Sequence, residues 1–121
     1  MAQVRYLVFD VDETIQFYTA NFGFELEQQY GPAMAILVLN DLKLWLAGPP
    51  ASASKPMPDG SRPEPGGWSR IVITVEDLNT LVASLKNEGV RFKNEILQGP
   101  GGKQILCIDP SGNLVELFQP E

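Results

Sequence analysis

The feature that most constrains this chain is an internal repeat, in which one order of predicted elements occurs twice. A strand-like segment over residues 3–9 precedes a helical pattern that ends at Gly23. Residues 70–75 and a helical pattern that ends at Gly89 repeat this order. Short apolar runs typical of three further strands follow each helix. The repeat therefore predicts an α+β fold made of two βαβββ modules.

The segment between the two copies has a different composition. Residues 48–67 are dominated by Pro and Gly, and no hydrophobic period continues through them. Such a segment is either a passive tether or a loop that covers a binding site. With 121 residues and 44% hydrophobic content, the chain is expected to form one domain. Its expected parts are module one over residues 1–47, a linker over 48–67 and module two over 68–121.

A hairpin near the end of the chain carries the acid of greatest interest. Residues 109–113, Asp-Pro-Ser-Gly-Asn, lie between two apolar runs and are typical of a tight turn. Glu116 follows in Leu-Val-Glu-Leu-Phe, as one acid among apolar neighbours. Such a carboxylate is either a surface group or a group placed inside a cavity.

Composition excludes several classes of partner. The net charge of -6 and the lack of a basic run argue against nucleic acid. No apolar stretch approaches the roughly 20 residues that span a bilayer, and no signal-peptide pattern opens the chain. The single cysteine, Cys107, excludes an internal disulfide and suits a cytoplasmic location. It lies in an apolar run, which favours a buried structural thiol over a nucleophile.

The chain contains no histidine. This excludes Ser-His-Asp and Cys-His catalysis and any imidazole-based metal site. Chemistry on this chain has to use carboxylates, Arg, Lys, Tyr, the thiol, backbone groups or a borrowed cofactor.

Several motifs, taken in order, resemble the vicinal oxygen chelate superfamily, which includes glyoxalase I, bleomycin-resistance proteins and extradiol dioxygenases. Residues 9–18 and 22–24 resemble its first module, and residues 70–78, 87–92 and 109–116 resemble its second. The resemblance implies that each module forms a curved mixed sheet with a helix on its outer face, cupping a small-molecule site. It also implies a homodimer.

The resemblance further implies four positions where metal-dependent members place their ligands. Placed by their distance from the helix-opening aspartates and from the prolines that follow the last strands, these are Gln3, Trp45, Arg70 and Glu116. Only Glu116 is a good ligand for a divalent cation, because Gln3 is a weak donor, Trp45 offers none and Arg70 would repel the metal. Arg70 is instead expected to pair with Glu116. The chain is therefore expected to hold no metal and no cofactor.

Strand alternation predicts which other side chains share a face with these four positions. Leu7 and Phe9 are in phase with Gln3 and would form apolar walls. The full set of candidate ligand-binding residues is Gln3, Arg5, Lys43, Trp45, Arg70, Thr74, Glu116 and Phe118. An apolar wall with a few polar groups is the usual make-up of a ligand pocket.

Each of these positions also has a structural interpretation. Trp45 can be core or dimer-interface packing, and Arg5 and Lys43 can lie on an exposed sheet face. The pair of Arg70 and Glu116 can be an ion pair that only fixes the module.

The leading hypothesis is a metal-independent binder of a small aromatic or anionic molecule, of the bleomycin-resistance kind. The alternative is a lyase, isomerase or dioxygenase-like enzyme that uses Glu116 as its general base or as a ligand. Arg70 would then stabilise an oxyanion. A third possibility is an interaction subunit whose sheets serve dimerisation only.

Overall fold

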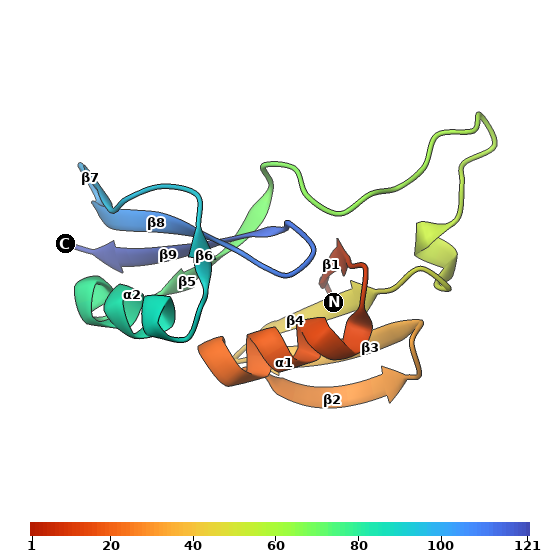
Figure 1. Cartoon of the computed structure of the whole chain (residues 1–121), viewed down its shortest axis with the longest axis horizontal. Helices are drawn as coiled ribbons and strands as arrows, with labels where there is room; N and C mark the ends of the chain where they lie inside the picture. The colour runs from red at the N-terminus through yellow and green to blue at the C-terminus, as the bar shows by residue number, and fades with distance from the viewer. The chain divides into compact units, whose positions relative to one another are not determined.

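The computed structural model describes residues 1–121, and the chain divides into two compact units, Met1–Gly66 and Gly67–Glu121. Figure 1 shows the elements of both units. The first unit contains β1 (Val4–Leu7), α1 (Val11–Phe22), β2 (Glu25–Tyr30), β3 (Met34–Leu39), β4 (Leu42–Ala47) and a short 3-10 helix (Ser52–Ser54).

The strands of the first unit form one mixed sheet in the order β1-β4-β3-β2. The edge strand β1 runs parallel to β4, whereas the other neighbours are antiparallel. A tight turn at Asn40 joins β3 to β4, and Asn40 has a φ of 53°, which asparagine tolerates better than most residues. The strand expected over residues 3–9 is shorter than predicted, so Gln3 precedes it and Phe9 follows it.

The helix α1 has the ends that its sequence predicts. The Asp10 side chain accepts a hydrogen bond from the backbone N–H of Glu13 at 2.9 Å, which satisfies one of the free donors of the first turn. Gly23 ends the helix with a φ of 76°. Tyr18 is fully buried, and its ring lies edge-on to Phe24. These contacts hold α1 against the sheet (Figure 1).

The second unit contains β5 (Arg70–Thr74), α2 (Leu78–Asn87), β6 (Arg91–Phe92), β7 (Leu97–Gly99), β8 (Gly102–Ile108) and β9 (Leu114–Pro120). Its sheet has the order β5-β9-β8-β6, and β7 also pairs with β8. The edge strand β5 is parallel to β9, so this sheet is mixed as well. Asp77 caps α2 by accepting from the backbone N–H of Thr80 at 3.1 Å. Neither α1 nor α2 is long and apolar enough to cross a membrane.

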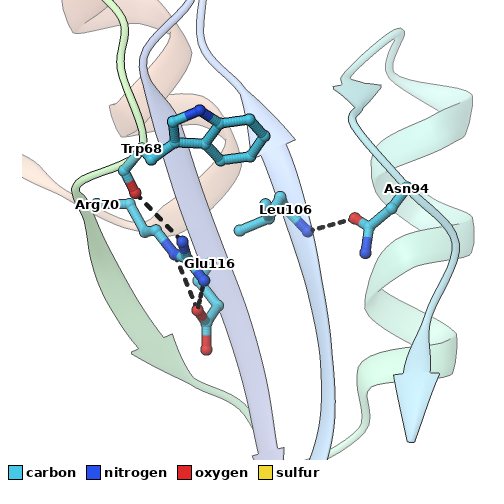
Figure 2. Close-up of polar contacts among 5 residues, drawn as sticks. All are labelled: Trp68, Arg70, Asn94, Leu106 and Glu116. Atoms are coloured by element: carbon cyan, nitrogen blue, oxygen red, sulfur yellow. Dashed lines mark hydrogen bonds and ion pairs between the residues drawn. The ribbon is translucent and has the colours of Figure 1, made fainter.

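The chain after α2 forms two short strands, β6 and β7, in place of one longer one. Between them, the backbone N–H of Lys93 donates to the carbonyl of Leu106 at 2.9 Å. The side chain of Asn94 accepts from the N–H of Leu106 at 3.0 Å (Figure 2). A side-chain amide thus replaces a backbone carbonyl at this point, and the ladder of β6 stops.

Residues 48–67 contain local turns and no strand. The hydroxyl of Ser54 donates to the carbonyl of Gly48 at 2.8 Å, which fixes the 3-10 turn. Further along, the N–H of Met57 donates to the carbonyl of Ser61 at 2.8 Å, and the N–H of Gly60 donates back to Met57 at 2.9 Å. The segment therefore has a defined path built from short-range hydrogen bonds.

The hairpin between β8 and β9 is tied together by a buried carboxylate. Asp109 is fully buried, and its Oδ1 accepts from the backbone N–H groups of Ser111 at 2.8 Å and Asn113 at 2.9 Å. Its Oδ2 accepts from the side chain of Asn113 at 3.2 Å. The predicted turn is confirmed, and the register of β9 follows from it.

Candidate functional site

The clearest polar feature of the second unit is the pair formed by Arg70 and Glu116. Arg70 opens β5, and its Nε and Nη2 both donate to Oε1 of Glu116, at 3.0 and 2.8 Å. Its Nη1 donates to the backbone carbonyl of Trp68 at 3.2 Å (Figure 2). The predicted charge-assisted pair is thus confirmed, and three of the guanidinium's N–H groups hold it in place.

The pair lies on the sheet face opposite the one that forms the core. In β9, Val115 and Leu117 are completely buried, whereas Glu116 points the other way, as strand alternation requires. Val72 lies opposite Glu116 in the register with β5, and Leu106 lies opposite it in β8. The Glu116 side chain is only 10% exposed, so an acid is held between apolar neighbours.

The two carboxylate oxygens of Glu116 differ in their surroundings. Oε1 accepts both hydrogen bonds from Arg70, while Oε2 accepts none from the protein. Oε2 is not fully buried, so it keeps some contact with solvent. This oxygen is available to accept a hydrogen bond, or a proton, from a bound molecule.

Thr74 and Phe118 complete the predicted residues of this unit. They lie opposite each other in the register of β5 and β9, so both share the face of Glu116. Thr74 is exposed and Phe118 is half-buried. The predicted grouping of Arg70, Thr74, Glu116 and Phe118 on one sheet face therefore matches the observed register.

Sequence reasoning missed two residues beside this pair. Trp68 is 65% exposed, and the ammonium of Lys93 lies 4.7 Å from the centroid of its ring. Trp68 also positions Arg70 through its carbonyl. The available signal for Trp68 was its position two residues before Arg70, a predicted site residue. That signal was overlooked because Trp68 directly follows the Pro/Gly-rich segment of residues 48–67. The sequence around Lys93 gave no signal, because Trp68, the residue that it contacts, lies far from it in the chain.

The remaining predicted residues belong to the first unit. Arg5 and Trp45 are register partners in β1 and β4, and the guanidinium carbon of Arg5 lies 5.1 Å from the centroid of the Trp45 ring. Lys43 lies two residues before Trp45, on the same face, and pairs with Glu27 at 3.0 Å. Gln3 is exposed and precedes β1.

Trp45 also contains the molecule's one unsatisfied buried polar side-chain atom. Its Nε1 is buried and has no hydrogen-bond partner. A buried N–H without an acceptor is uncommon in folded proteins and calls for a physical explanation.

The donor set does not fit a divalent metal. No three His, Cys, Asp or Glu side chains are grouped where they could hold one. Of the four positions implied by the resemblance, only Glu116 carries a carboxylate, and the guanidinium of Arg70 neutralises it at 2.8 Å. A catalytic metal needs about three protein ligands, and a fixed cation at this distance opposes its binding.

Two surface hollows are lined by none of the eight candidate ligand-binding residues. One, of about 380 Å³, is lined in the second unit by Lys86, Val90, Phe92, Lys93, Asn94 and Glu95. The other, of about 310 Å³, lies in the first unit beside the start of α1 and is lined by Phe9, Asp10, Val11, Asp12, Pro32, Pro49 and Pro50. Phe9, which was expected to form a pocket wall with Leu7, lines this second hollow instead.

Cys107 is not placed for nucleophilic chemistry. The thiol is fully buried in β8, and burial raises its pKa to about 12. It is therefore protonated at neutral pH, and the thiolate is the reactive form.

We accordingly expect no reaction of Cys107 with Ellman's reagent in the native protein at pH 8, and complete reaction in denaturant. Because the folded pKa is raised from 9.0, unfolding releases a proton between pH 9 and about 12, so stability falls as pH rises through this window. A Cys107→Val variant should lose this component of the alkaline slope in urea titrations. Rapid native labelling would contradict the assignment.

Comparison with known proteins agrees with this architecture. A family model described as Glyoxalase/Bleomycin resistance protein/Dioxygenase superfamily matches residues 1–117. Lactoylglutathione lyase from Agrobacterium tumefaciens is 18% identical with a TM-score of 0.76, over 98% of this chain and 92% of that chain. TnmS3, an antibiotic binding protein from Streptomyces sp. CB03234, is 24% identical with a TM-score of 0.70, over 100% and 98%.

A third solved structure is the fosfomycin resistance protein FosX from Listeria monocytogenes, complexed with Mn(II) and sulfate. It is 15% identical with a TM-score of 0.75, over 100% of this chain and 90% of that chain. At these identities the likeness shows a shared fold alone. No curated protein matches the chain.

Proposed function

The chain belongs to the Glyoxalase/Bleomycin resistance protein/Dioxygenase superfamily, and from this premise we propose that it binds a small aromatic or anionic molecule without a metal ion. The proposal takes the two units as the paired βαβββ modules of the superfamily, joined by residues 48–67. Its ligand contacts are the predicted residues: Gln3, Arg5, Lys43 and Trp45 in the first unit, and Arg70, Thr74, Glu116 and Phe118 in the second.

The observation that carries the proposal is the state of Glu116. Its Oε1 is neutralised by Arg70, and its Oε2 has no partner in the protein. A carboxylate held in this way is a fixed hydrogen-bond acceptor on an apolar face, which suits a ligand's hydroxyl or amino group. The antibiotic-binding and antibiotic-resistance proteins that share the fold support a binding role of this kind.

Titration with a panel of aromatic metabolites and antibiotics tests the proposal. Trp45 and Trp68 are the chain's two tryptophans, so a Trp68→Phe variant makes the emission report on Trp45 alone. We expect at least one compound to change the emission with a saturable dependence. A panel without any saturable change, confirmed by calorimetry on the unmodified protein, would contradict the proposal.

We expect Glu116→Gln to weaken binding of the selected compound about tenfold or more. The substitution replaces a charged acceptor by a neutral amide, and hydrogen bonds to charged groups are worth about 1.5–3 kcal/mol. Glu25→Gln is the matched control, because Glu25 lies exposed in β2 and forms no ion pair. Equal affinities for the two variants, measured at a temperature where both are folded, would show that Glu116 does not contact the ligand.

The second candidate is an enzyme in which Glu116 acts as general base, and the unbonded Oε2 favours it. Arg70 would then stabilise the oxyanion that forms when the proton is removed. Product analysis after incubation with the bound compounds separates the two functions. Turnover that Glu116→Gln abolishes without loss of binding would establish the enzyme.

The resemblance also supports a homodimer, which we include in the proposal. Light scattering during size-exclusion chromatography should then give twice the mass of one chain. A mass equal to one chain at micromolar concentration would contradict it.

A further inference from the structure

The open face of the first sheet carries two hydrogen-bond donors that lack an acceptor. The first is Nε1 of Trp45, which is buried and unsatisfied. The second is the guanidinium of Arg5, which forms no ion pair and donates no hydrogen bond within the chain. The buried N–H is the unusual one of the two, because the guanidinium of Arg5 is exposed to water. The two residues are register partners on adjacent strands.

The local charge balance makes this pair of donors more notable. The chain has a net charge of -6, so carboxylates are plentiful. The other cation of this face, Lys43, is paired with Glu27 at 3.0 Å. Arg5, by contrast, rests on the Trp45 ring, with 5.1 Å between the guanidinium carbon and the ring centroid. Within the chain, its charge is met by the face of an aromatic ring and by no carboxylate.

From these two observations we propose that Arg5 and Trp45 form a subsite for an anionic oxygen, with a ligand carboxylate as its natural occupant. One carboxylate oxygen accepts from the guanidinium of Arg5, and the other accepts from Nε1–H of Trp45. The inference rests on the proposed binding function and narrows its ligand class to compounds that join an aromatic or apolar body to an acid group.

The proposed subsite joins an exposed donor, Arg5, to a buried one, Nε1 of Trp45. The side chain of Arg5 lies over the ring, is exposed and has a flexible stem, so it can swing with the incoming anion. The indole N–H is buried in the free protein and has no acceptor there. An acceptor for that N–H is then supplied only by the ligand, which makes the buried donor a source of binding selectivity.

The experiment removes a single donor while keeping the shape of the ring. In a Trp68→Phe background, Trp45 is the chain's only tryptophan, so biosynthetic labelling replaces its indole alone with benzothienylalanine, in which sulfur takes the place of N–H. The probes are naphthoate, which carries a carboxylate, and naphthylmethylammonium, which carries the same ring system with a cation. Binding is followed by the indole N–H resonance of Trp45 and by calorimetry.

We expect naphthoate to move the Trp45 N–H proton resonance downfield and naphthylmethylammonium to leave it in place. Benzothienylalanine at position 45 and the separate Arg5→Met variant should each weaken naphthoate binding about tenfold. The free sulfur isostere should melt at the same temperature as the tryptophan form or higher, because no hydrogen bond is lost.

Three results would overturn the inference: a lower melting temperature of the isostere, an unmoved Trp45 resonance in naphthoate, or equal naphthoate affinity with and without the N–H. The two proposals also fail separately. Panel compounds that bind and respond to Glu116→Gln, with Trp45 unaffected by naphthoate, overturn this inference and leave the binding function standing. Naphthoate binding at Trp45, with no panel compound sensitive to Glu116→Gln, supports the subsite and contradicts the role given to Glu116.

Discussion

Replacing Asp109 with alanine is expected to lower the free energy of unfolding by about 2–5 kcal/mol. The carboxylate is fully buried and accepts from the backbone N–H groups of Ser111 and Asn113 and from the Asn113 side chain. Alanine removes the shared acceptor of two backbone N–H groups in a buried turn, and the loss of such an acceptor costs about 1–3 kcal/mol for each bond. Urea denaturation followed by circular dichroism measures the difference.

Asp41→Ala is the matched control, because Asp41 is also an aspartate in a hairpin turn but is exposed and accepts no hydrogen bond. Its substitution should change stability by less than about 0.5 kcal/mol. Similar losses for the two variants would show that the buried hydrogen bonds of Asp109 do not stabilise the turn. The result also bears on function, since this turn sets the register that places Glu116 on the open face.

The second large effect is expected for Gly102→Ala, at the start of β8. A β-carbon here would collide with the backbone carbonyl oxygen of Gln119 and lie 2.9 Å from the α-carbon of Pro120. Its φ of 148° is also one that residues with a side chain rarely adopt. Because Gly102 and Pro120 are paired across β8 and β9, the backbone has little room to move. We expect a loss of about 2–4 kcal/mol, measured by the same denaturation.

Gly101→Ala tests whether the collision is the cause. At this neighbouring position, the nearest atom to a new β-carbon is Cζ of Phe118 at 3.8 Å, an ordinary contact. We expect this variant to stay within about 1 kcal/mol of the parent protein. A loss as large as that of Gly102→Ala would mean that the turn, and not the close strand approach, demands glycine.

The elements with local signals could be predicted from the sequence. The helix that Asp10 caps and Gly23 ends has both signals within its own segment. Alternation in β9 separated Glu116 from the core residues Val115 and Leu117 without knowledge of any partner strand. Such signals act between residues a few positions apart, so a single sequence carries them.

The contacts between distant segments could be predicted only where the resemblance supplied an alignment. It placed Arg70 and Glu116 at related positions, and their pairing followed from charge. It gave no account of Lys93 beside Trp68, nor of Asn94 replacing a backbone carbonyl, because these depend on how a loop crosses the sheet. The orphaned N–H of Trp45 is likewise a property of the packed side chain and not of its residue type.

The two faces of β9 carry side chains with different roles, and this has an evolutionary consequence. Val115 and Leu117 determine whether the strand packs, whereas Glu116 and Phe118 face away from that core. Mutations at the second set can therefore accumulate while selection for folding acts on the first. Residues that pack the core and residues of the proposed site therefore alternate along the same strand. Under the proposed binding function, a lineage with this architecture can change its ligand through substitutions that leave the core residues unchanged.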